Sequence, residues 1–109
     1  MILVFTKFPI HSKHLNDFKE RAVSSFGQKG VRAQAGFVSM RLLAPEQYPD
    51  MPENNIFIIE TLWQDMESFK AYTKSEAYKK AHEDGPPREW FAGRPTVELY
   101  DLAKEMLAE

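Results

Sequence analysis

Cysteine is absent from this chain of 109 residues. The absence excludes a disulfide, an iron–sulfur cluster, a thiolate metal site and a cysteine nucleophile. It also fits a reducing compartment, so we expect a cytoplasmic protein. No apolar run approaches the ~20 residues that a membrane-spanning helix needs. The apolar start at Met1–Phe5 is too short for a signal peptide and is expected to be a strand.

An excess of charge of one sign is missing as well. The 14 Lys and Arg residues stand against 16 Asp and Glu, for a net charge of −2 and a sequence pI of about 5.9. The chain therefore lacks the basic footprint of a nucleic-acid or anionic-membrane binder, and we expect neither partner. It also lacks a glycine-rich phosphate loop and the HExxH and GxSxG motifs.

Ordinary globular composition is what remains. Hydrophobic residues make up 43% and charged residues 28% of the chain, which excludes disorder. A chain of this length is the size of one domain, so we expect a single domain over 1–109.

Four segments have the β-branched and aromatic composition of strands, at 1–8, 36–44, 56–64 and 96–102. The proline-rich segment 45–55 is expected to connect two strands of a hairpin, and 83–95, with its prolines and glycines, is expected to be a loop.

Helical spacing of apolar residues follows the first and third strands. Ser12 is expected to cap a first helix, and Asp65 a second one that Ser75 bends or restarts. The order β-α-β-β-α-β predicts an α+β, ferredoxin-like fold with an antiparallel sheet.

Both faces of the predicted sheet are apolar, whereas an antiparallel sheet with one wet face should alternate. Strict alternation gives the third strand Ile56, Ile58 and Leu62 on one face and Phe57, Ile59 and Trp63 on the other. A large exposed apolar face is typical of an interface. We therefore expect a homodimer through the sheet faces; an open sheet with scattered apolar residues is the alternative. For the second strand, alternation puts Phe37 and Leu43 against Val38, Met40 and Leu42.

Three residues are candidates for catalytic chemistry. His82 ends the predicted second helix, where an imidazole could ligate haem iron, act as acid or base, or simply cap the helix. Tyr72 lies on the inward face of that helix, and Trp63 ends a strand where an aromatic often closes a cavity. In a continuous helix Tyr72 and His82 would be ~15 Å apart, which excludes a proton relay but suits residues that flank one large flat ligand.

The loop 85–94 groups Arg88, Trp90, Phe91 and Arg94. Exposed aromatics and arginines suit a lid for an anionic aromatic ligand. The same aromatics could equally pack against the sheet or a partner subunit. His11 and His14 have metal-compatible spacing but no third ligand nearby, which favours a solvated helix start.

The stretch from Glu60 to His82 (ETLWQDMESFKAYTKSEAYKKAH) resembles the core signature of the antibiotic biosynthesis monooxygenase superfamily, nearest the haem-degrading branch, and Ala35–Leu43 resembles its second strand. The resemblance implies a dimeric α/β barrel with a pocket between the helices and the sheet of each unit. It implies that His82 would be the axial haem ligand. Two positions depart from the haem-degrading pattern: Tyr72 replaces a tryptophan, and Thr6 or Lys7 replaces a first-strand asparagine.

The resemblance implies a monooxygenase that either degrades haem or oxidises a phenolic substrate without a cofactor. The alternatives are a non-catalytic ligand-binding or stress-related dimeric barrel and, by analogy of fold alone, an isomerase or lyase. Haem, as substrate or cofactor, is the candidate tetrapyrrole ligand, and no other metal is expected. The expected catalytic residues are His82, Tyr72 and Trp63, and the expected substrate-binding residues are Phe69, Trp90, Phe91 and Arg94.

Overall fold

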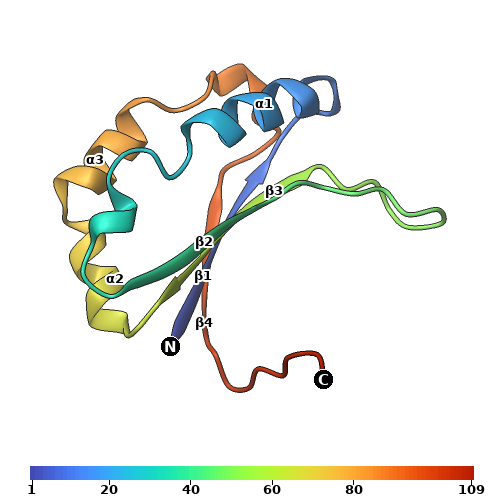
Figure 1. The fold of residues 1–109 in the computed structure, drawn as a ribbon. Helices are drawn as coiled ribbons and strands as arrows, with labels where there is room; N and C mark the ends of the chain where they lie inside the picture. The colour runs from blue at the N-terminus through green and yellow to red at the C-terminus, as the bar shows by residue number, and fades with distance from the viewer.

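A four-stranded antiparallel sheet carries its helices on one face (Figure 1). The computed structural model describes all residues 1–109. The strand order is β2-β3-β1-β4, so the predicted α+β, ferredoxin-like topology is confirmed. The elements in chain order are β1 (Ile2–Pro9), α1 (Leu15–Ser25), β2 (Phe37–Leu43), β3 (Ile56–Trp63), α2 (Met66–Thr73), α3 (Glu76–Glu83) and β4 (Thr96–Asp101). Short 3-10 turns lie at Ser12–His14, Val31–Ala33 and Arg88–Trp90.

Side-chain caps divide the second helical segment into two helices. The Asp65 carboxylate accepts a hydrogen bond from the backbone N–H of Ser68 at 2.8 Å, which starts α2. The Ser75 hydroxyl accepts one from the N–H of Tyr78 at 3.2 Å, which starts α3. Both residues therefore act as the sequence predicts, because each satisfies an N–H that the first turn of a helix leaves free.

The predicted cap of the first helix is wrong. A 3-10 turn at Ser12–His14 precedes α1, whose N-cap is His14 without a side-chain hydrogen bond. The Ser12 hydroxyl instead donates to the carboxylate of Glu53, in the connection between β2 and β3. A contact between residues 41 positions apart competes with the local cap, and no local pattern signals it.

A β-bulge changes the faces of β2. Phe37 is paired with Trp63 and Ser39 with Leu62, so one extra residue, Val38, is inserted. Because side chains alternate along a strand, the insertion reverses the face of every residue after it. Phe37 and Met40 therefore share the helix-covered face, and the face assignment from strict alternation was wrong for this strand.

Two hydrophobic clusters fill the space between helices and sheet. One is built on the buried residues Ile10, Phe18, Ala22 and Phe57. The other is built on Val4, Val31 and Trp63. Their positions matter because the cavity described below is lined by residues that pack on both clusters.

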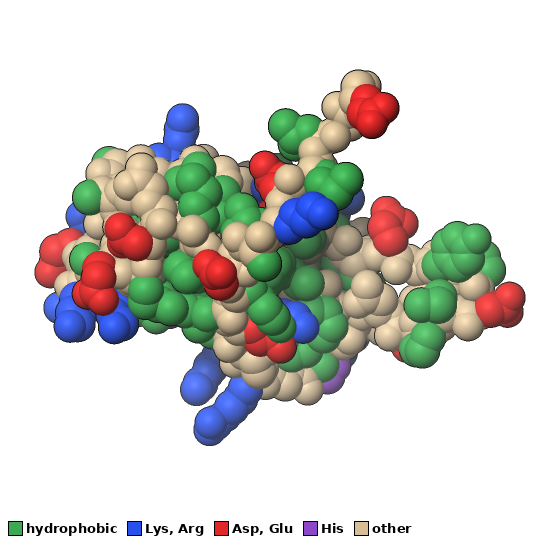
Figure 2. Space-filling view, turned by 90° about the horizontal axis from the view of Figure 1, so that it is seen from below, with side chains coloured by type: hydrophobic (Ala, Val, Ile, Leu, Met, Phe, Trp, Pro, Cys, Tyr) green, Lys and Arg blue, Asp and Glu red, His purple; other side chains and the backbone are tan.

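Two segments project from this body (Figures 1 and 2). The connection 44–55 extends as an arm beyond β2 and β3, and Tyr48 and Met51 on it are largely exposed. The chain after β4 leaves the sheet as an extended tail with exposed Met106 and Leu107. None of the helices has the length and apolar character that crossing a membrane requires.

Candidate functional site

A cavity of about 620 Å³ lies between α1, α3 and the helix-covered face of the sheet. That volume is within the usual range for a small-molecule site. Its sheet side is formed by Val4, Thr6 and Phe8 of β1, Met40 of β2, Ile59 and Thr61 of β3 and Val97 of β4. Its helix side is formed by Phe26, Phe69, Tyr72, Tyr78, Ala81 and His82. Polar and charged residues, among them Arg21, Ser24, Ser25 and Lys29, line the side toward α1, so the lining combines an apolar and aromatic part with a polar one.

His82 reaches this cavity from the end of α3. Its Nδ1 lies 2.8 Å from the backbone carbonyl oxygen of Tyr78, one helical turn earlier. Because a carbonyl oxygen can only accept, Nδ1 carries the proton of the neutral imidazole, and the lone pair lies on Nε2. The imidazole also packs on the Tyr78 ring, with centroids 4.0 Å apart. A fixed tautomer leaves Nε2 free to bind a metal centre or to accept a proton.

Tyr72 forms part of the same wall. Its ring stacks on Trp63 at 5.1 Å and meets the edge of Tyr78 at 5.4 Å. Burial raises the pKa of the Tyr72 phenol above its ordinary value of 10, and the nearby Tyr78 adds to the rise. The continuous helix behind the ~15 Å estimate does not form, because Ser75 starts a new helix. A single aromatic ring, that of Tyr78, lies between Tyr72 and His82.

Trp63 lies behind Tyr72 and is 0% exposed. It is not part of the cavity wall, although the sequence placed it there. Its indole N–H donates to the Thr61 hydroxyl at 3.0 Å, which satisfies a buried donor. Phe69 is on the wall, with its ring 6.0 Å from that of Trp63. Trp63 therefore supports two wall residues from below.

The loop 85–94 is tied down rather than free. The Ala92 N–H donates to the Pro9 carbonyl at 2.9 Å, and Phe91 forms an isolated bridge with Ile10. Phe91 lines the cavity and also packs against the hydrophobic core, so it is a fixed part of the fold as well as a wall residue. Trp90 stacks on His14 at 5.7 Å, outside the cavity, and Arg94 is exposed and outside it too.

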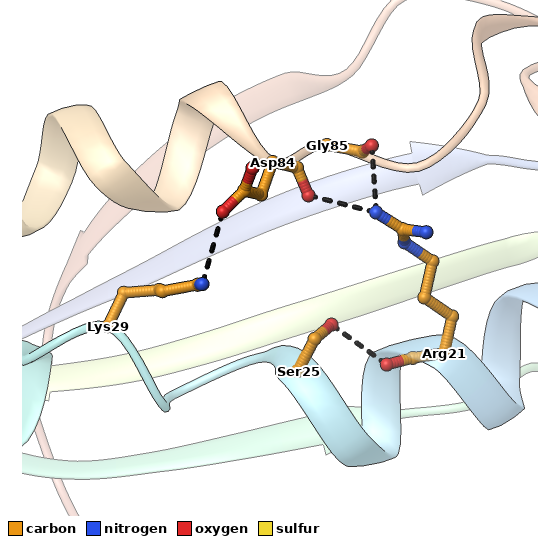
Figure 3. A network of polar contacts seen from close by, with 5 residues as sticks. All are labelled: Arg21, Ser25, Lys29, Asp84 and Gly85. Carbon is orange, nitrogen blue, oxygen red and sulfur yellow. Dashed lines mark hydrogen bonds and ion pairs between the residues drawn. The ribbon is translucent and has the colours of Figure 1, made fainter.

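Two cations at the cavity were not found from the sequence (Figure 3). Arg21 of α1 donates through Nη2 to the carbonyl oxygens of Asp84 at 3.1 Å and Gly85 at 3.0 Å. Lys29 pairs with the Asp84 carboxylate at 3.1 Å. All four residues line the cavity. The three-residue spacing from Phe18 places Arg21 beside the buried face of α1, but no local signal in the sequence links Arg21 to Asp84 and Gly85.

The two first-strand positions considered from the sequence, Thr6 and Lys7, lie on opposite faces of β1. Thr6 lies on the cavity floor. Lys7 points to the opposite face of the sheet, where its ammonium group lies 3.0 Å from the Glu98 carboxylate. His14 is likewise engaged elsewhere, 3.1 Å from the Asp17 carboxylate, and the structure contains no group of three side chains placed to hold a metal ion.

One family model matches most of this chain. Residues 1–84 match the family model described as antibiotic biosynthesis monooxygenase. The chain is 29% identical over 83 residues to a haem-degrading monooxygenase of Shouchella clausii, which covers 75% of each chain.

Solved structures of this fold include a haem degrader from Mycobacterium tuberculosis with two haems in its active site (TM-score 0.73, 15% identity, 97% of this chain and 99% of that one). They also include a monooxygenase of Streptomyces coelicolor in complex with nanaomycin D (TM-score 0.67, 17% identity, 99% and 92%). At these identities the two structures show a shared fold.

Proposed function

This chain belongs to the antibiotic biosynthesis monooxygenase family, and from that premise we propose that it is an oxygenase with haem as its substrate and His82 as the iron ligand. One observation carries the proposal. On the wall of a cavity of about 620 Å³, His82 has its Nδ1 tied to the Tyr78 carbonyl and its Nε2 free. The naming of the Shouchella clausii relative as a haem-degrading monooxygenase supports the same substrate.

The residues of the cavity fit a large, flat, mostly apolar ligand. The imidazole of His82 is held at one nitrogen by a backbone carbonyl, which is the usual arrangement for a metal-binding histidine. When haem is bound and reduced, its iron would supply the reaction with O₂. The protein binds the iron through Nε2, orients the ring system against Phe69 and Tyr72, and excludes water with the apolar sheet side.

Tyr72 and Thr6 supply the polar groups at the positions that depart from the haem-degrading pattern. The Tyr72 phenol is protonated at neutral pH, as any tyrosine is, and burial raises its pKa further, so its O–H can donate a hydrogen bond to a ligand. The Thr6 hydroxyl on the floor can donate or accept one. Together they would stabilise negative charge that develops on an oxygen-containing intermediate.

Titration of the purified protein with ferric haem tests the proposal. We expect a shifted Soret band in the wild type, loss of that shift in His82→Ala, and bile-pigment absorption after a reductant is added in air. His11→Ala is the matched control, because His11 is exposed and does not line the cavity. A Soret band that is the same in wild type and His82→Ala would contradict the proposed ligand.

Cofactor-independent oxidation of a phenol is the second candidate. The observation that favours it is the protonated phenol of Tyr72 on an aromatic wall, which could bind a phenolate substrate. The relative in complex with nanaomycin D is a monooxygenase with an aromatic ligand, which supports this class. Oxygen uptake with model hydroquinones should then fall in Tyr72→Phe, without added haem. Uptake that is unchanged by the substitution would exclude this candidate.

A homodimer through the open faces of the sheets is the third part of the proposal. The strand registers put these apolar side chains on the face without helices: Leu3, Phe5, Leu43, Ile56, Ile58, Leu62 and Tyr100. Glu60, in the middle of this face, is only 11% exposed at its side chain and pairs with Arg41. Figure 2 shows hydrophobic side chains gathered between charged ones in the view from below. An apolar face that no helix of the same chain covers is typical of an interface between subunits.

Light scattering tests the dimer. We expect the wild type to be dimeric at micromolar concentration and Leu62→Arg to be monomeric, because a charge would be buried without a partner. Val23→Arg is the control, since Val23 is 66% exposed on α1. A monomeric wild type would refute the assembly.

The cytoplasmic location expected from the sequence remains a prediction.

A further inference from the structure

A polar cluster joins α1 to the chain that follows α3 (Figure 3). We propose that Arg21 is the positioning residue for His82: by anchoring the end of α3 to α1, it holds the imidazole at the cavity. The inference rests on the proposed function, because it takes His82 as the residue that binds the ligand. Arg21 itself has no contact with His82 in this cluster and would act through the backbone of Asp84 and Gly85.

Helix α3 has little packing of its own to hold it. None of its residues is buried, and Ser75 separates it from α2. The hydrogen bond of the His82 ring runs to Tyr78 of the same helix. That bond fixes the ring within α3 and leaves the place of α3 in the fold undetermined. The position of the His82 imidazole at the cavity wall therefore depends on what anchors α3.

Helix α1 is a firm support by contrast. Phe18 and Ala22 are 0% and 2% exposed and belong to the hydrophobic core. Arg21, next to Ala22, donates from one nitrogen to two carbonyl oxygens just after α3. A charged donor forms stronger hydrogen bonds than a neutral one, and a cation is also favoured at the negative end of a helix dipole.

Two further observations support an anchoring role for Arg21. The Nε of Arg21 is buried without a hydrogen-bond partner. Burial of this nitrogen shows that the guanidinium lies against the protein, where Nη2 makes its two carbonyl contacts. The second link, from Lys29 to Asp84, has side chains 40% and 69% exposed and is therefore weakened by salt. Arg21 is the principal anchor.

Hydrogen–deuterium exchange of the haem-free protein tests the anchoring directly. In Arg21→Gln we expect the amides of 79–83 to exchange on the order of tenfold faster than in the wild type, because two charge-assisted hydrogen bonds are lost. Arg21→Lys keeps the charge without the planar fork and should lie between the two. The matched control is Arg32→Gln, which removes an exposed arginine outside the cavity lining and should leave α3 unchanged.

Ferric haem gives the second readout. In Arg21→Gln we expect a broader distribution of electron paramagnetic resonance g-values for bound haem, because the imidazole would adopt a wider range of orientations. In Arg21→Lys we expect a distribution narrower than in Arg21→Gln. Should Arg21→Gln fail to fold, as a thermal melt would show, Arg21→Lys decides by the same two measurements.

The inference and the proposed function can fail separately. A Soret band unaffected by His82→Ala overturns the haem proposal. Exchange of α3 that is unaffected by Arg21→Gln overturns the anchoring, whatever His82 binds. Faster exchange with unchanged g-values would show that α3 is anchored by Arg21 but that His82 is not positioned through it, which also overturns the inference.

Discussion

The approach of α2 to the start of β2 leaves no room for a side chain at Gly36, and Gly36→Ala is therefore expected to destabilise the fold. Gly36 has φ +81°, in the left-handed region that glycine favours. A Cβ built there would lie 2.0 Å from the hydroxyl oxygen and 2.4 Å from the Cβ of Ser68. Ser68 belongs to the capped first turn of α2, so it cannot move away without disturbing the Asp65 cap.

The expected loss combines two effects. The left-handed backbone costs an alanine roughly 1–2 kcal/mol, and overpacking against a fixed neighbour costs typically about 1–3 kcal/mol. Together they lower the free energy of unfolding by roughly 2–5 kcal/mol, a large fraction of the stability of an ordinary domain. Because α2 also carries Phe69 and Tyr72, ligand binding in the cavity should weaken as well.

A double-mutant cycle in urea separates the two effects. Ser68→Gly removes both clashing atoms, so the nearest remaining atom to the new Cβ is the Ser68 Cα at 3.8 Å. The double variant should therefore recover about 1–3 kcal/mol relative to the sum of the single changes. Trp63 fluorescence can follow unfolding. Wild-type stability in Gly36→Ala, or additive single changes, would refute the packing described here.

Three further results are expected. Thr61→Val should lower the free energy of unfolding by about 1–3 kcal/mol in urea, because the Trp63 indole N–H is left buried without an acceptor; unchanged stability would contradict that bond. The pKa of Tyr72 is raised in the folded protein, so above pH 10 the unfolded chain loses a proton that the folded protein keeps. The free energy of unfolding should therefore fall as the pH rises from 10 toward the folded pKa. Tyr72→Phe should reduce that loss in thermal melts at alkaline pH. The hydrogen bond from the Ser68 N–H lowers the pKa of Asp65 below 3.8. The Asp65 carboxylate therefore stabilises the fold above pH 3.8, and this stabilisation is lost as the pH falls through the folded pKa. Asp65→Asn should flatten this dependence of stability on acid pH.

The strands and helix starts of this protein follow from local patterns. Pro45 after β2, the apolar run of β3 and the two caps at Asp65 and Ser75 act within a few residues of the chain, so their effect does not depend on the rest of the fold. The order of these elements then leaves few topologies, and the ferredoxin-like one was predicted correctly. Ser12 shows where such reasoning fails, because a distant carboxylate competes for its hydroxyl.

The candidate site depended more on tertiary contacts. His82, Tyr72 and Phe69 were identified from the sequence and do line one cavity. Trp63 was placed on the wall but lies behind it, because the strand end is covered by α2. The Trp90 ring turned to His14 rather than to the cavity.

Residues 1–109 by themselves determined the strands, the helices, their order and the resemblance to a family, since propensity, capping and apolar periodicity are properties of neighbouring residues. Only the tertiary structure decided which side chains share a surface. The extra residue at Val38 reversed part of β2, and the break at Ser75 left one ring between Tyr72 and His82. Arg21 donates a hydrogen bond to Asp84, at the end of α3, although the two residues are 63 positions apart in the sequence. Contacts of that separation are made by packing the whole chain, and local sequence carries no record of them.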